Sequence, residues 1–135
     1  MASRYLLDTD TAGSVIKGNV PAVRSRLEKI PMAQIAVSSV TEAELRHGAA
    51  RLPGAKRLHA IIDEFLLRVT ILPWDSEAAR QYGRLRASLE RQGRPMGNLD
   101  TMIGAQALAS ELVLVTNDRA FGRIKKLRIE DWTKA

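Results

Sequence analysis

Five short apolar runs recur along the chain, and each one ends in turn-forming residues. They occupy positions 4–7, 34–40, 69–74, 112–116 and 127–132. Compact runs of this kind that contain β-branched residues are typical of buried β-strands, so the pattern predicts five strands.

Between these runs, apolar residues fall at helical spacing. In the segment from residue 75 to residue 93, one face is formed in steps of four, three and four by Ala78, Tyr82, Leu85 and Leu89. Asp75 or Ser76 can cap the start of this helix, and Gly93 suits its end. Another helix is predicted from about residue 56 to residue 68, with one stripe made by Leu58, Ile61, Ile62, Phe65 and Leu66.

The alternation of strands and helices predicts an α/β domain with a mainly parallel sheet and right-handed crossovers. With 135 residues and 45% apolar content, the chain has the size of one ordinary domain and enough apolar surface for a core. The sequence shows no repeat and no low-complexity tract. We therefore expect a single domain over residues 1–135.

Composition excludes several kinds of site and location. The sequence has no cysteine, which excludes disulfides, a thiolate zinc site and a thiol nucleophile, and which permits a reducing compartment. The chain reaches acidic residues soon after its first two leucines, too early for a signal peptide, and no apolar run approaches a membrane span. We expect a soluble, cytoplasmic protein with no membrane partner.

The charge balance is basic. Lys and Arg number 21 against 15 acidic residues, which gives a net charge of +6. Such a surface favours contact with a polyanion such as nucleic acid, or with an acidic partner. It equally fits a surface that is only solubilising, and charge alone does not separate the two.

Four acidic residues fall where ligands bind in a parallel sheet, beyond the carboxyl ends of the strands. Asp8 directly follows the first strand, Asp118 follows the fourth after one turn residue, and Glu44 lies one turn into the helix after the second. Asp100 begins a helix that leads back into the fourth strand, so this helix must start at the same edge. The positive end of the helix dipole favours the ionised form of Asp100.

Each of these acids also has an ordinary explanation. Asp8 in DTDT can close an Asx-turn, and Glu44 completes a capping box with Thr41. Asp100 can stabilise the first turn of its helix, and Asp118 in TNDR can be a turn former. These ordinary roles do not predict that all four carboxylates reach one edge of one sheet.

Converging carboxylates repel one another, and some would stay protonated unless a cation joined them. A hard divalent cation, Mg²⁺ or Mn²⁺, removes the conflict, because both accept oxygen ligands and keep waters for a substrate. Zinc is a poor candidate, since the two histidines, His47 and His59, lie on charged segments. A histidine-based triad is also hard to assemble, because Ser38 and Ser39 lack the glycines of a nucleophile elbow.

An acid cluster with basic surroundings points to phosphodiester chemistry. A divalent cation polarises a phosphate and lowers the pKa of a bound water, while Lys and Arg hold the polyanion. Aromatic residues are 4% of the chain, so contacts to backbone and shape fit better than base stacking. The residues expected to bind the polyanion, and to make its affinity salt-dependent, are Arg94, Arg119, Arg123, Lys125 and Lys126.

Five segments resemble, in order, the motifs of the PIN-domain family and, within it, of the VapC toxins. They are YLLDTD at 5–10, SSVTEAELRHGA at 38–49, QGRPMGNLDTMIGAQALA at 92–109, LVLVTNDRAFGRI at 112–124 and LRIEDW at 127–132. No single motif is decisive, but five at familiar spacing are specific, and together they span nearly the whole chain.

The resemblance implies a three-layer α/β/α, ribonuclease H-like fold and an endoribonuclease that depends on Mg²⁺ or Mn²⁺. The products would carry 5′-phosphate and 3′-hydroxyl ends. By the match of motifs, the catalytic and metal-binding roles fall to Asp8, Glu44, Asp100 and Asp118. Thr9 and Thr116 match small hydroxyl positions that support the site in relatives, and each also fits a simple turn.

The same resemblance implies partners. The substrate would be a structured RNA, with transfer RNA prominent among the family's substrates, and the active form would be a homodimer. A cognate, VapB-like antitoxin would silence the enzyme with a tail that enters the acidic groove, and DNA would be contacted only through that complex. The apolar stripe within residues 58–66 is core by default, and it could also seat a dimer or an antitoxin helix.

Two positions depart from the family pattern. Asp10 stands where relatives usually have asparagine, and we interpret it as part of an Asx-turn rather than as a weak outer ligand. Gly104 stands where alanine is common, and it is predicted only to loosen its helix, by up to about 1 kcal/mol.

Three other classes of protein share part of this pattern. A haloacid-dehalogenase-type phosphatase has two aspartates spaced as in LLDTDT, but it wants Thr or Val at Ala12 and a late acidic pair. A receiver-like module needs a phosphoacceptor after its third strand, where Pro73 and Trp74 stand. A catalytically silent PIN scaffold would also fit the fold, although loss of function ordinarily erodes the acids, and all four are present.

Overall fold

The sheet at the centre of the molecule has five short parallel strands. The computed structural model describes residues 2–134, in which the strands are β1 (Tyr5–Leu7), β2 (Ile35–Ser38), β3 (Thr70–Leu72), β4 (Val113–Val115) and β5 (Ile129–Glu130). Their order across the sheet is β3-β2-β1-β4-β5. Every pairing is parallel, so the five carboxyl ends meet at one edge.

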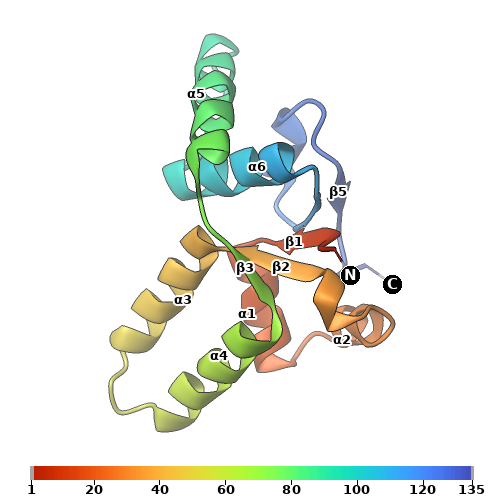
Figure 1. The fold of residues 1–135 in the computed structure, drawn as a ribbon, viewed down its shortest axis with the longest axis vertical. Helices are drawn as coiled ribbons and strands as arrows, with labels where there is room; N and C mark the ends of the chain where they lie inside the picture. Colours follow the sequence, from red (N-terminus) through yellow and green to blue (C-terminus); the bar gives the residue numbers. More distant parts are fainter. Residues whose placement is uncertain (1, 135) are drawn as a thin grey trace.

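Helices cover both faces of this sheet (Figure 1). In chain order they are α1 (Thr9–Lys17), α2 (Pro21–Glu28), α3 (Ser39–Ala50), α4 (Lys56–Arg68), α5 (Ser76–Arg91) and α6 (Asn98–Ser110), with short 3₁₀ turns η1 (Met32–Gln34) and η2 (Arg119–Arg123). Helices α5 and α6 lie on one side of the sheet, whereas α1, α2 and α4 lie on the other. The predicted three-layer α/β/α fold is confirmed. Among residues 2–134, no helix combines the length and the apolar character that a membrane crossing requires.

Each helical layer has its own core, because successive side chains of a strand point to opposite faces. The core on the α1, α2 and α4 side includes Tyr5, Leu7, Val37, Phe65 and Trp132. The core on the α5 and α6 side includes Leu6, Ala36, Leu89, Ile103 and Phe121. Burial on both faces explains why the strands appear in the sequence as continuous apolar runs.

The second strand is shorter than the predicted run of residues 34–40. It ends at Ser38, whose Oγ accepts a hydrogen bond from the Val40 N–H at 3.0 Å and caps α3. Thr41 lies inside α3 and is fully buried, so the predicted capping box of Thr41 and Glu44 is wrong. The cap falls three residues earlier because Ser38, at the strand end, presents its hydroxyl to the first free N–H groups of the helix.

Two predicted helices are confirmed. Helix α4 spans Lys56–Arg68, and α5 begins after Asp75, whose Oδ1 accepts the N–H of Ala78 at 3.1 Å. Gly93 follows α5 with φ +66°, a left-handed conformation that glycine adopts without a steric penalty.

Gly104 allows α6 to pack closely against the segment after η2. A Cβ at this position would lie 2.8 Å from Cδ1 of Ile124 and 3.8 Å from Cδ2 of Leu85. Ile124 is buried, so a contact this short would force its side chain to shift. The loosening of the helix stays a prediction, and the structure adds that glycine here leaves room for the terminal methyl of Ile124.

Candidate active site

Asp8 is buried at the carboxyl end of β1, with 4% of the residue exposed. It is the N-cap of α1, and its Oδ1 accepts the Thr11 N–H at 2.8 Å. Its Oδ2 accepts the Thr116 hydroxyl at 2.5 Å. Burial raises the pKa of Asp8 above the ordinary 3.8, against the hydrogen bonds from Thr116 and Thr11, and the Asp10 carboxylate adds to the increase. The expected turn role therefore exists as a helix cap, in a carboxylate that is also desolvated.

Thr116 joins Asp8 to Asp118. Its hydroxyl donates to Asp8, and the same oxygen accepts the Asp118 N–H at 3.0 Å. Asp118 in turn caps η2, with Oδ1 accepting the N–H of Ala120 at 2.9 Å. One buried hydroxyl thus fixes the segment that connects two of the four predicted acids.

Glu44 reaches the same edge from α3 and is held by a chain of hydroxyl groups. The Thr9 hydroxyl donates to Glu44 Oε1 at 2.6 Å, and its oxygen lies 3.1 Å from that of Thr41. Because Thr9 has one hydroxyl hydrogen and gives it to the carboxylate, Thr41 must donate to Thr9. Sequence reasoning missed Thr41 as part of the site. Its position one helical turn before Glu44 could have indicated a contact at the site, but this spacing was interpreted as a capping box.

Asp100 faces the other acids from the first turn of α6. Burial raises its pKa above the ordinary 3.8, and the increase is extended, in this order, by the carboxylates of Asp118, Asp8, Glu44 and Asp10. The expected effect of the helix dipole is outweighed, because desolvation and four like charges act against the ionised form. The same repulsion means that the fold brings these carboxylates within electrostatic range of one another.

Asp10 is a fifth carboxylate at this edge. It lies in the first turn of α1 and is exposed. The interpretation as an Asx-turn is wrong, because the residue is helical and its neighbour Asp8 makes the cap. Its charge contributes to the raised pKa values of both Asp8 and Asp100.

No internal cation neutralises these five carboxylates in the described part of the chain. The ion pairs between residues 2 and 134 use other acids, namely Glu42, Asp63, Glu64, Glu77, Glu90 and Glu130. Within the same residues, no three acidic or histidine side chains lie close enough to ligate one ion without moving. The donor set still fits a hard divalent cation, because it is made of oxygen atoms whose mutual repulsion such an ion removes.

The predicted basic residues divide between two places. Arg94, Arg119 and Arg123 line a basin of about 410 Å³ between the segment before α6 and η2, the turn that begins directly after Asp118. Arg123 Nη1 donates to the Pro95 carbonyl at 3.1 Å and links the two walls. Lys125 and Lys126 instead line a separate pocket, next to the last turn of α6. The five residues therefore do not form one surface.

Known proteins with similar sequences and folds have names that describe a nuclease. A curated relative from Shigella flexneri, "tRNA(fMet)-specific endonuclease VapC", is 39% identical over 131 residues, which cover 96% of this chain and 98% of the relative. Ribonuclease VapC2 from Haemophilus influenzae is 38% identical and covers the same shares of both chains. A crystal structure of DNA-bound VapBC from Salmonella typhimurium superposes with a TM-score of 0.90 at 37% identity, over 96% of this chain and 98% of that one.

The family model described as "PIN domain" matches residues 5–127, from the start of β1 to just before β5. The match includes all five carboxylates at the sheet edge. It also includes Thr9 and Thr116, whose hydroxyls donate to Glu44 and Asp8 respectively. The chain therefore belongs to the PIN-domain family, and within that family it groups with the VapC ribonucleases.

Proposed function

We propose that this protein is a metal-dependent endoribonuclease, the toxin of a VapBC-type toxin–antitoxin pair. The observation that carries the proposal is the set of carboxylates at one sheet edge, which repel one another and have no cation in the described chain to neutralise them. Carboxylates that repel one another, together with the basic basin at η2, are consistent with a bound cation and a polyanionic substrate.

Nucleases of the PIN-domain family generally use divalent metal ions. For this chain we propose Mg²⁺ or Mn²⁺, because the donors are all oxygen atoms. The residues that would hold the ion are Asp8, Glu44, Asp100 and Asp118. When bound, such an ion supplies the positive charge that polarises a phosphodiester and lowers the pKa of water.

The protein's own groups position the carboxylates and the substrate. Thr116 orients Asp8, and Thr9 orients Glu44, each through a hydroxyl that donates to a carboxylate oxygen. At Asp8, the hydrogen bond from Thr116 lowers the pKa and so favours the ionised form against burial. Arg94, Arg119 and Arg123 line the basin at η2, the turn that Asp118 caps, where they would hold the sugar–phosphate backbone.

The substrate we propose is structured RNA in the cytoplasm, with transfer RNA as the first candidate. Curated relatives from Shigella flexneri and Salmonella typhimurium are both named as tRNA(fMet)-specific endonucleases, at 39% and 38% identity. The scarcity of aromatic side chains agrees with recognition of backbone and shape rather than of stacked bases.

The function is tested by incubating the pure protein with transfer RNA and with total RNA, in Mg²⁺, in Mn²⁺ or in EDTA. We expect cleavage with either ion, none in EDTA, and fragments with 5′-phosphate and 3′-hydroxyl ends. Cleavage that continues in EDTA would contradict the dependence on metal. Intact RNA in both ions would instead favour a catalytically silent scaffold.

We also propose that the antitoxin docks in an apolar groove between α1, α2 and α4. The groove has a volume of about 280 Å³, and its walls include Ile16, Leu27, Ile61 and Phe65. Only part of the apolar stripe on α4 is core, since Phe65 is buried whereas Ile61 is half exposed. The similar Salmonella typhimurium structure is a VapBC complex, which supports a protein partner for this chain, and the exposed apolar wall is what favours this face.

The expected result is that Ile61→Arg prevents co-purification with the co-expressed cognate antitoxin, because a charged side chain replaces an apolar wall of the groove and would lose its water when the antitoxin covers it. Leu52→Arg, at a 54% exposed leucine outside the groove, is the matched control. Equal co-purification of both variants would show that the antitoxin binds elsewhere. In this proposal, DNA is contacted only through the antitoxin complex.

Two further expectations, the single domain and the homodimer, stay predictions. One is that residues 1–135 form a single domain, which is supported by the pairing of β5, beyond the family match, with β4. The other is the homodimer, for which analytical ultracentrifugation of the isolated chain is the direct measurement.

A further inference from the structure

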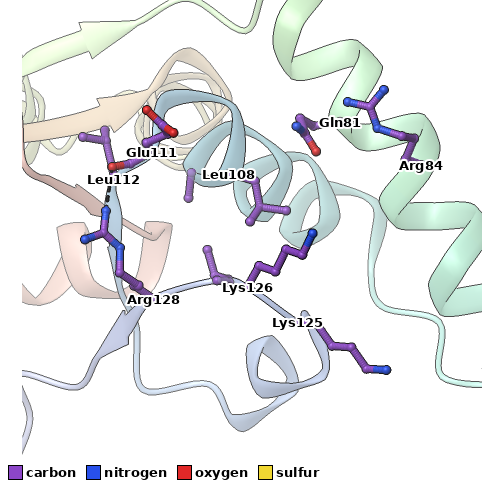
Figure 2. Close-up of a pocket in the computed structure, with 10 residues that line it drawn as sticks. Gln81, Arg84, Leu108, Glu111, Leu112, Lys125, Lys126 and Arg128 are labelled. Carbon is purple, nitrogen blue, oxygen red and sulfur yellow. Dashed lines mark hydrogen bonds between the residues drawn. The ribbon is translucent and has the colours of Figure 1, made fainter.

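A second basic pocket lies at the amino edge of the sheet, opposite the acids. Helix α6 begins beside the acids at Asp100, and its last turn reaches the start of β4. The pocket lies between that last turn, α5 and the segment that leads into β5 (Figure 2). It has a volume of about 650 Å³, and its polar lining consists of Gln81, Arg84, Glu111, Lys125, Lys126 and Arg128.

The charges in this pocket are unbalanced. The lining contains four cations and one carboxylate, Glu111, and none of the five takes part in an ion pair within residues 2–134. Arg128 uses Nη2 to donate to the Glu111 carbonyl at 2.9 Å, which leaves its other donors for a ligand. In Figure 2, Lys126 extends toward α5 and α6, and Arg84 projects from α5. The pocket therefore offers several hydrogen-bond donors to an anion.

The backbone of the pocket is unusual as well. Glu111 and Lys126, with φ of 55° and 70°, are the non-glycine residues in residues 2–134 that have a positive φ, and both line this pocket. Glu111 ends α6, since its N–H bonds to the Leu108 carbonyl at 3.3 Å. The conformation of Lys126 places a long cationic side chain at a position where glycine would be the unstrained choice.

We propose that this pocket is an exosite that binds the phosphate backbone of the same RNA molecule that reaches the acids. The inference rests on the proposed function and extends it to the size of the substrate. Asp100 and Glu111 are eleven residues apart on α6, which is about 17 Å at the rise of an α-helix. One phosphate would fill little of the pocket, whereas a strand that contacts both places needs at least about five stacked nucleotides.

The exosite explains how the enzyme would favour large structured RNA over short strands. A short oligonucleotide reaches the acids and the adjacent arginine basin alone, whereas a folded RNA also gains the contacts at the amino edge. Because these contacts lie far from the acids, they change affinity and not the chemical step. Each phosphate contact should also add roughly 0.7 to 0.9 to the slope of log affinity against log salt.

The test compares Lys125→Gln/Lys126→Asn with the wild-type protein, since asparagine tolerates the left-handed backbone at position 126. The matched control is Lys56→Gln/Arg57→Gln, which removes two exposed charges from α4 on the other side of the sheet. Affinities are measured by fluorescence anisotropy in EDTA over a series of salt concentrations. The probes are an initiator transfer RNA transcript, a three-nucleotide RNA that is too short to contact both places, and a DNA duplex of the same charge as the transfer RNA.

We expect the pocket variant to bind the transfer RNA at least tenfold more weakly, with a salt slope lower by about 1.5. Its affinity for the three-nucleotide RNA should stay at the wild-type value, and the control variant should match the wild-type protein with every probe.

The exosite would be overturned if the pocket variant bound transfer RNA with the wild-type affinity and salt slope. It would also be overturned if the variant lost as much affinity for the short RNA as for transfer RNA. A wild-type protein that bound the DNA duplex as tightly as transfer RNA would overturn it as well. If the wild-type protein cleaves transfer RNA in Mg²⁺ while the pocket variant binds it normally, only the exosite fails. If the wild-type protein neither binds nor cleaves RNA, the proposed function fails with it.

Discussion

Asp100→Asn should lower the rate of RNA cleavage by about 10²- to 10³-fold or more while the chain stays folded. Asp100 receives repulsion from four other carboxylates, so it lies where a bound cation would be shared. Asparagine keeps the shape of the side chain but removes the charge that such an ion and its substrate need. The measurement is the initial rate of transfer RNA cleavage in Mg²⁺, together with the circular dichroism spectrum of the variant.

Asp10→Asn is the matched control, because it removes one carboxylate from the same edge. Asp10 is exposed at the start of α1 and is not among the proposed ligands, so its variant should cleave at nearly the wild-type rate. Wild-type cleavage by Asp100→Asn would remove Asp100 from the site. Complete loss of cleavage in Asp10→Asn would show that the fifth carboxylate belongs to it.

The positions of the four acids could be predicted because they follow from topology. In a parallel sheet, the residue after each strand must lie at the carboxyl edge, which places Asp8 and Asp118. A helix that returns to β4 must start at that same edge, which places Asp100. Neither step needs a side-chain conformation, and the strands at 4–7, 69–74 and 112–116 were predicted to within about two residues.

Other features of the site depend on contacts that no local pattern contains. The role of Thr41 follows from the packing of α1 against α3, which brings Thr9 to its hydroxyl. Lys125 and Lys126 are close to Asp118 in sequence, but the chain turns back along α6 after η2 and carries them to the opposite edge. The close approach of Ile124 to Gly104 likewise appears only when Ile124 is packed against α6.

A divalent cation should reverse the order of thermal stability of the wild-type protein and Asp100→Asn. Without metal at pH 7, the variant should have the higher melting temperature, because it lacks a desolvated and repelled charge. With Mn²⁺ at ten times its dissociation constant, the wild-type protein should gain about 1.4 kcal/mol, and the variant much less. That gain corresponds to roughly 3 to 8 °C in melting temperature, which differential scanning fluorimetry resolves.

The pH dependence of this difference separates repulsion from an unrelated gain in packing. Because the folded-state pKa of Asp100 lies above 3.8, the native protein binds its proton more tightly than the unfolded chain does. As pH rises from 3.8 through the raised folded-state pKa, the metal-free wild-type protein therefore loses stability relative to the variant. Below pH 3.8 the stabilities of the two proteins converge. A variant that keeps its full advantage below that pH would be stabilised by packing instead. Equal stabilisation of both proteins by Mn²⁺ would mean that the ion binds outside this site and that Asp100 is not one of its ligands.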